Sequence, residues 1–315
     1  MKRFGKSLRN GVKIGVTCLA VVIMFSGCNK SVTGVTLDKT TLTLCVGDTA
    51  ILTAAIQPAD AGERGLSWSS SNNDAATVWN GTITAKAMGT TTITVTTSDG
   101  NKTATCIVTV RHPAEPEMVF VEGGTFMMGA DDDKNGEQVT VSSFYIAKYE
   151  VTQKQWVSVM GDNPSYYRGN DNLPVDGVNW NYAQQFIFKL NQATGKNYRL
   201  PTNAEWEYAA CGGNKSKGYK YSGSNNIDEV AWYNKNSGWQ THPVGSKAAN
   251  ELGIYDMSGN LSEWCDGWFI NSEEGRPCRG GNWDWGAEDC RVSYGVGIPP
   301  NIWASEFGFR LVLDE

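Results

Sequence analysis

The chain has 315 residues and a formal net charge of −6 at pH 7, from 27 lysine and arginine side chains against 33 aspartate and glutamate side chains. Beyond the basic N-terminus nothing in the sequence resembles a basic stripe, so nucleic acid is excluded as an expected partner. The length exceeds that of one typical domain, and we expect two hydrophobic cores.

Residues 1–28 have the pattern of an export signal. Basic residues lie within Lys2–Lys13, and the apolar run Ile14–Phe25 that follows is too short to span a membrane stably. The run ends in Phe25-Ser26-Gly27-Cys28, which resembles a bacterial lipobox with phenylalanine in place of the usual leucine. This resemblance implies that Cys28 is lipidated; the alternative is an ordinary cleaved signal. We expect a lipid-anchored protein of the bacterial envelope, surface-exposed rather than periplasmic.

Residues 31–111 have the pattern of a β-sandwich. In short runs such as Thr105–Val110, threonines alternate with apolar residues, and turns that contain glycine separate the runs. About seven such strands in a segment of this length are typical of an immunoglobulin-like sandwich. The phrases Leu66–Asn72 and Gly81–Ala85 resemble the group 2 bacterial immunoglobulin-like domain. The resemblance implies a spacer or adhesive module without catalytic residues, with Trp68 in its core.

Residues 112–116 form a short linker, in which two prolines favour extended backbone. The second domain covers residues 117–315 and changes from the period of strands to that of helices. Thr152–Gln155 and Thr202–Glu205 are capping boxes, and each predicts the start of a short helix. Between them the apolar residues of Trp180–Leu190 follow helical spacing. Scattered aromatic residues and many glycines predict an irregular core with little regular secondary structure.

Four phrases of the second domain occur in the order found in a known family. They are Tyr149–Gln153, Gly161–Ser165, Arg199–Ala210 and Gly259–Trp264. The domain resembles the formylglycine-generating enzyme, or sulfatase-modifying factor, family, whose fold is C-type-lectin-like. The sequence therefore predicts an all-β immunoglobulin-like sandwich followed by an α+β, C-type-lectin-like domain.

The resemblance also shows which chemistry is missing. Copper-dependent oxidases of this family carry two cysteines five residues apart, whereas this chain has Trp285 and Cys290 at the two positions. Because cuprous ion prefers a pair of thiolates, we expect no copper. A three-histidine iron site is excluded too, since the chain has only His112 and His242. We assign no catalytic residue, except Cys290 if the protein is nevertheless an oxidase.

A calcium site is the best-supported chemistry. Asp256, Gly259, Leu261 and Glu263 offer two carboxylates and two carbonyl groups from one tight turn, and calcium prefers hard oxygen ligands. These positions resemble a structural calcium site of the family, with Asp256 in place of an asparagine. The alternative is a solvated acidic turn without a metal.

The C-terminal region departs from the family between two preserved phrases, Arg279–Gly281 and Gly308–Leu311. Anchored ends with an unusual middle, Tyr294–Phe307, resemble the variable proteins of diversity-generating retroelements, which present a mutable segment on this fold. The resemblance implies a protein or glycan ligand. The expected contact residues are Asp284, Trp285, Glu288, Tyr294, Val296, Ile298, Asn301, Ile302, Trp303 and Glu306. Partial burial of the aromatic residues, an oxidase acting on a sulfatase cysteine, and a structural envelope component remain alternatives.

Six cysteines follow Cys28, and six cysteines allow fifteen complete pairings. Cys45 and Cys106 fall on an early strand and on the last strand of the sandwich, so a disulfide between them is one option. Cys265 and Cys278 lie at the facing ends of two predicted strands that a short loop joins. We predict a disulfide between this second pair.

Overall fold

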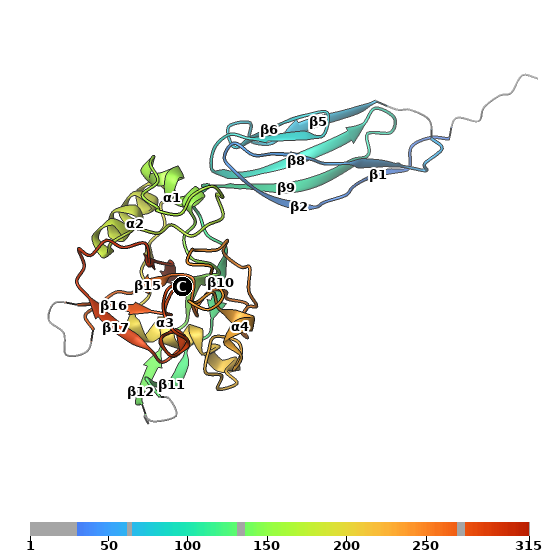
Figure 1. Cartoon of the computed structure of the whole chain (residues 1–315). Helices are drawn as coiled ribbons and strands as arrows, with labels where there is room; N and C mark the ends of the chain where they lie inside the picture. The colour runs from blue at the N-terminus through green and yellow to red at the C-terminus, as the bar shows by residue number, and fades with distance from the viewer. Residues whose placement is uncertain (1–29, 62–64, 131–135, 270–274, 315) are drawn as a thin grey trace, which may run out of the picture.

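The computed structural model describes residues 30–61, 65–130, 136–269 and 275–314. The predicted signal and Cys28 lie outside these residues. Figure 1 shows an elongated sandwich joined to a larger head in which short strands and helices are connected by long loops. No helix among the described residues is long and apolar enough to cross a membrane.

The N-terminal domain is the predicted sandwich. Its sheets have the strand orders β2-β9-β8-β5 and β3-β7-β6, with a separate β1-β4 pair. Ile83, Ile93 and Val108 lie in its core, and Trp68 packs partly buried against them, as expected. The strands are β1 (Gly34–Leu37), β2 (Thr41–Cys45), β3 (Thr49–Ile51), β4 (Ala54–Gln57), β5 (Leu66–Ser70), β6 (Ala76–Trp79), β7 (Thr82–Ala85), β8 (Gly89–Thr97) and β9 (Thr103–Arg111).

The register of β2 and β9 separates the two cysteines of the sandwich. The strands are parallel neighbours, and Cys45 lies opposite Arg111, whereas Cys106 lies at the other end of the pair, next to the Thr41↔Ile107 pair. Both thiols are free. A disulfide between Cys45 and Cys106 is therefore excluded by the register, although the strands are adjacent.

The linker is docked on the head. Ala114 is 1 % exposed and belongs to the head's hydrophobic core. Glu115 accepts a hydrogen bond from the His112 amide and forms an ion pair with Lys196. These contacts hold the linker against the head.

The head contains two four-stranded sheets, β10-β13-β19-β14 and β17-β16-β15-β18, and a β11-β12 hairpin. Its strands are β10 (Met118–Val121), β11 (Gly124–Met128), β12 (Glu137–Val141), β13 (Phe144–Ala147), β14 (Tyr198–Arg199), β15 (Ser262–Trp264), β16 (Arg276–Arg279), β17 (Gly295–Ile298), β18 (Phe307–Gly308) and β19 (Val312–Asp314). Its helices are α1 (Gln153–Met160), α2 (Trp180–Thr194), α3 (Asn203–Ala210), α4 (Ile227–Val230) and the 3-10 turns η1 (Gly213–Lys215) and η2 (Ala287–Cys290).

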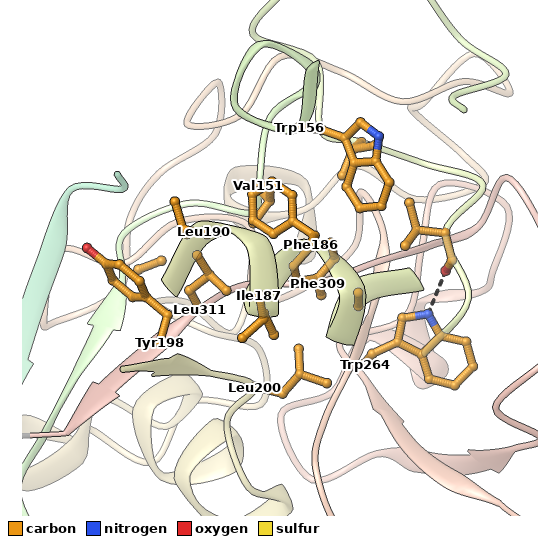
Figure 2. Close-up of a cluster of buried hydrophobic side chains, with 14 of the residues drawn as sticks. Val151, Trp156, Phe186, Ile187, Leu190, Tyr198, Leu200, Trp264, Phe309 and Leu311 are labelled. Carbon is orange, nitrogen blue, oxygen red and sulfur yellow. Dashed lines mark hydrogen bonds between the residues drawn. The ribbon is translucent and has the colours of Figure 1, made fainter. Parts of the chain in front are cut away.

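The predicted helix signals of the head are confirmed. Thr152 and Thr202 form complete capping boxes at the starts of α1 and α3. α2 buries its apolar face and ends at Gly195, whose φ of 70° is left-handed. Figure 2 shows the cluster that it covers, where the Trp156 ring stacks 5.3 Å from that of Phe186.

The predicted disulfide between Cys265 and Cys278 is wrong. β15 and β16 do pair, but Trp264 lies opposite Cys278, so the next residue, Cys265, points to the other face of the sheet. The two thiols are buried in separate hydrophobic clusters and both are free. Burial raises the pKa of each thiol above its ordinary value.

Candidate ligand-binding surface

The position of the oxidase thiolate pair holds an indole and a buried thiol. Trp285 is half-buried, and its ring meets the edge of Tyr294 at 6.2 Å. Cys290 is fully buried beside Tyr221 and Tyr233. Burial raises the pKa of the Cys290 thiol to about 12, so in the absence of a metal ion the thiol is protonated at neutral pH.

The turn predicted to bind calcium lies in a buried cluster of charges. Both oxygens of Glu263 are occupied, because Arg310 donates to them at 2.6 and 2.7 Å and the Trp206 indole donates to one at 2.7 Å. Asp256 accepts from the Gly245 amide at 2.7 Å. Asp256, Gly259 and Leu261 lie in the turn before β15, whereas Glu263 lies in that strand and already has a cationic partner.

Sequence analysis missed two members of this cluster, Glu150 and Arg310. Glu150 accepts from the Asn260 side chain and from the Leu261 amide, so it closes the same turn. Burial raises its pKa well above the ordinary range, and burial raises that of Asp256 to about 6. Glu150 and Arg310 both lie in phrases that resemble the family. They are far apart in the sequence, and only the fold brings their charges close together.

The cluster partly suits a cation. Three buried acidic side chains, Glu150, Asp256 and Glu263, interact with the guanidinium of Arg310, which pairs directly with Glu263, so the carboxyl groups of Glu150 and Asp256 have no ion-pair partner among the described residues and could accept a cation. However, no group of three histidine, cysteine or acidic side chains within the described ranges is arranged to hold a metal ion. Calcium therefore stays a prediction, and the Arg310 guanidinium is its competitor for Glu263.

The predicted contact residues separate into two groups. In one, Trp285 and Tyr294 touch, and Glu288 pairs with Lys220 at 3.0 Å and with Arg291 at 3.4 Å. On β17, Val296 and Ile298 pack against the core and are only half-exposed, so they mainly support the fold. The other group consists of Asp284, Asn301, Ile302, Trp303 and Glu306.

This second group is the more exposed one. Trp303 is 50 % exposed and Ile302 is 42 % exposed. The buried Trp283 donates its indole N–H to the Ser305 carbonyl at 3.2 Å. This bond ties the segment that carries Asp284 to the segment that carries Glu306.

Three exposed or half-exposed aromatic residues from other segments join this group, and sequence analysis missed them. Tyr166 is 76 % exposed and Trp239 is 63 % exposed. The Tyr167 hydroxyl donates to the Trp239 carbonyl at 2.6 Å, and its ring lies 5.4 Å from that of Trp283. We define the aromatic surface by the four residues Tyr166, Tyr167, Trp239 and Trp303, with the buried Trp283 packed against Tyr167.

The tyrosine pair of the aromatic surface rests on a buried carboxylate. Asp176 accepts from the amides of Tyr166 at 2.6 Å and of Tyr167 at 3.3 Å. Burial raises the pKa of Asp176 to about 6. An open hollow of about 450 Å³ lies between this loop and the segment Trp303–Ser305. The hollow is the concave part of the candidate surface.

Comparison with known families decides the assignment of the head. Residues 103–315 match the sulfatase-modifying factor enzyme 1-like domain. The chain belongs to the sulfatase-modifying factor enzyme 1-like family. Residues 31–108 match the bacterial Ig-like domain of group 2, so both predicted domain families are confirmed.

Proteins similar to this family member have names that indicate different functions. It is 40 % identical over 263 residues to a protein of Paenibacillus barcinonensis named chaperone protein LppX, covering 66 % of this chain and 92 % of that protein. It is 28 % identical over 225 residues to the formylglycine-generating enzyme of Thermomonospora curvata, covering 48 % of this chain and 71 % of that enzyme.

The solved structure of Treponema denticola variable protein 1 is similar to the head of this family member. The two align with a TM-score of 0.58 and 30 % identity, covering 69 % of this chain and 97 % of that chain. The predicted likeness to a variable protein is thereby confirmed for the fold. Family membership alone does not decide between oxidation and binding, because enzymes and a variable protein are both similar to this chain.

Proposed function

We propose that the head is a non-catalytic binding domain that contacts a protein or glycan target through its C-terminal loops. The observation that carries the proposal is the state of the oxidase position. Trp285 supplies no thiolate there, and the pKa of Cys290 is raised to about 12 by burial. One buried thiol is a poor ligand for cuprous ion, so no metal activates oxygen at this position.

The exposed loop supports binding. Ile302 and Trp303 lie between β17 and β18, and both of these strands belong to the same four-stranded sheet. A loop whose two ends are fixed in one sheet can change its sequence without changing the fold. This arrangement, with the likeness to Treponema denticola variable protein 1, supports a retroelement-type variable protein.

The remaining parts of the proposal place the head in the bacterial envelope. We infer an exported lipoprotein anchored at Cys28, with the immunoglobulin-like sandwich as a spacer between membrane and head. The basic and apolar runs before Cys28 support export. Structural calcium in the head belongs to the same proposal.

A direct assay separates this proposal from the oxidase alternative. The purified chain is incubated with a cysteine-containing sulfatase peptide, with and without copper, and the peptide is measured by mass spectrometry. We expect no aldehyde product in either case. Aldehyde formation that depends on Cys290 would establish the oxidase. A reverse transcriptase gene beside a near-copy of the 3′ coding end, differing at adenines, would support the retroelement assignment.

The relative named chaperone protein supports a second candidate, in which the head binds unfolded protein clients. The same loops would then contact apolar client segments, and Ile302 and Trp303 offer exposed apolar area for this. Light scattering of heated citrate synthase distinguishes the two candidates. A chaperone suppresses the aggregation at equimolar amounts, whereas a receptor for one specific target leaves it unchanged.

A further inference from the structure

The aromatic surface is built from segments far apart in the chain. Tyr166 and Tyr167 precede α2, Trp239 follows α4, and Trp303 and the buried Trp283 belong to the C-terminal region. Ser237 holds the Trp239 amide at 3.1 Å and donates its own hydroxyl to the Trp283 carbonyl at 2.7 Å. The C-terminal loops are therefore one part of a surface to which the rest of the head contributes exposed rings.

Trp239 has an unusual backbone for a large residue. Its φ is 64°, in the left-handed region that non-glycine residues rarely adopt, and its ring is 63 % exposed. Strained backbone persists where neighbouring contacts fix it, and it is concentrated at functional sites. Here the hydrogen bonds of Ser237 and Tyr167 keep the indole in solvent although its burial would be favourable.

The same surface carries unpaired negative charge. Asp284 and Glu306 form no ion pair with any part of the chain that the structure describes. Burial raises the pKa of the Tyr167 hydroxyl, and neighbouring groups that include Glu306 and Asp284 raise it further. Both carboxylates are thus close to the tyrosine.

One positive charge lies at the edge of this surface. Arg168 lines the hollow, and its guanidinium donates to the carbonyls of Ser165 at 2.8 Å and Asn163 at 2.7 Å. Two carboxylates, Asp284 and Glu306, stand against this one guanidinium, so the negative charges of the surface outnumber the positive one at neutral pH.

We propose that the aromatic surface, with Asp284 and Glu306, binds a positively charged protein segment rich in arginine or lysine. The planar guanidinium of arginine stacks on exposed rings and pairs with carboxylates, so it satisfies both features at once. The hydroxyls of a neutral glycan can donate hydrogen bonds to the two carboxylates but leave their charge unneutralised, and an acidic glycan is repelled. The inference rests on the proposed function, because it identifies the class of target for the same face of the head.

The test measures binding of fluorescent hexa-arginine, hexalysine and hexaglutamate peptides to the full chain by anisotropy, at low and at about 0.15 M ionic strength. We expect hexa-arginine to bind best and hexaglutamate not to bind. Asp284→Asn with Glu306→Gln weakens hexa-arginine binding by roughly tenfold. The control, Asp74→Asn with Glu137→Gln, removes the same charge at exposed positions elsewhere and leaves binding unchanged.

A second pair of variants tests the aromatic part. Tyr166→Ala weakens hexa-arginine binding by roughly fivefold, and Tyr166→Phe retains it, because the ring supplies the contact. Trp79→Ala removes a ring that is 85 % exposed on the sandwich and serves as the matched control. Melting curves confirm that every variant is folded.

Two results with the peptides overturn the inference: hexa-arginine does not bind, or it binds the double variant Asp284→Asn with Glu306→Gln as tightly as the control variant. A neutral or acidic glycan that binds through Trp303 also overturns it, but leaves the proposed function standing. The proposed function itself fails when targets bind independently of the C-terminal loops, or when the chain forms the aldehyde product in a reaction that depends on Cys290.

Discussion

Cys290 lies against the backbone of Gly281, and this contact determines how the thiol behaves. A Cβ at position 281 would lie 2.7 Å from the Cys290 sulfur, and Gly281 has a φ of 66°. Only glycine fits such a close approach in the left-handed region. The thiol is thus enclosed by main chain as well as by Tyr221 and Tyr233, and it acts as a packed apolar group.

We expect Cys290 to resist alkylation in the folded protein. Its pKa of about 12 and full burial keep it protonated and out of contact with reagent. Cys45, which is half-exposed, reacts earlier. Iodoacetamide treatment at pH 8 followed by peptide mapping checks the order. Modification of Cys290 before Cys45 in native protein would contradict the assignment of a buried thiol.

Asp176 gives a pH-dependent contribution to stability. Its folded pKa of about 6 lies above its ordinary value of 3.8, so the folded state binds the proton more tightly than the unfolded state. The ionised form therefore destabilises the fold at pH 7, and this penalty is relieved progressively as the pH falls below about 6 toward the ordinary value of 3.8. Protonation of Asp176 therefore makes the unfolding free energy about 2 kcal/mol larger at pH 4.5 than at pH 7, compared with a side chain that does not titrate.

Asp176→Asn isolates this effect, because asparagine does not titrate. Asparagine also replaces one of the two oxygens that accept from Tyr166 and Tyr167, so the variant is less stable at every pH. We expect the difference in unfolding free energy from wild type to be about 2 kcal/mol larger at pH 4.5 than at pH 7. Urea unfolding measures it, and an equal difference at both pH values would refute the raised pKa.

Among the secondary-structure elements, the starts of helices could be predicted from the sequence, whereas the register between paired strands could not. The capping boxes at Thr152 and Thr202 act within four residues, so the sequence alone predicts the starts of α1 and α3. The pairing of the two strands near Cys265 and Cys278 was predicted correctly, but Cys265 lies one residue beyond the end of β15, and the facing of the two thiols depends on a one-residue register that no local signal specifies.

The candidate site was predictable in part, for the same reason. The exposed loop at Ile302 and Trp303 follows from its departure from the family pattern. Tyr166 and Trp239 join this loop only through tertiary contacts, and neither belongs to the C-terminal region that drew attention. The partnership of Glu263 with Arg310 likewise connects strand β15 to the segment before β19.

Calcium binding tests the charge cluster that connects these elements. Because Arg310 pairs with Glu263, the carboxyl groups of Glu150 and Asp256 are left for a cation, and we expect that calcium stabilises the fold. A hundredfold excess over Kd adds about 2.7 kcal/mol to the unfolding free energy. Asp256→Asn with Glu263→Gln removes the gain. Calorimetry measures the melting midpoint in calcium and in chelator. Identical midpoints would contradict calcium binding and indicate that Arg310 alone neutralises the cluster.

In the whole molecule, the exposed C-terminal loop between β17 and β18 is held at both ends by strands of the head. The docked linker joins the sandwich to the head's core through Ala114. The last strand, β19, lies inside the sheet between β13 and β14, so the chain on the C-terminal side of the loops is held by two neighbours. Sequence changes in the loops therefore need not disturb the rest of the head, as a display function requires.

The most direct measurement compares binding and folding in one loop variant. Wild-type chain is screened on an array of surface proteins and glycans, and each target that binds is titrated against Ile302→Ala with Trp303→Ala, with Trp79→Ala as control. Because both loop residues are about half-exposed, we expect an unchanged melting temperature. We expect affinity to fall roughly thirtyfold or more, the loss typical of an interface hot spot. A loop variant that melts and binds like wild type would contradict the account.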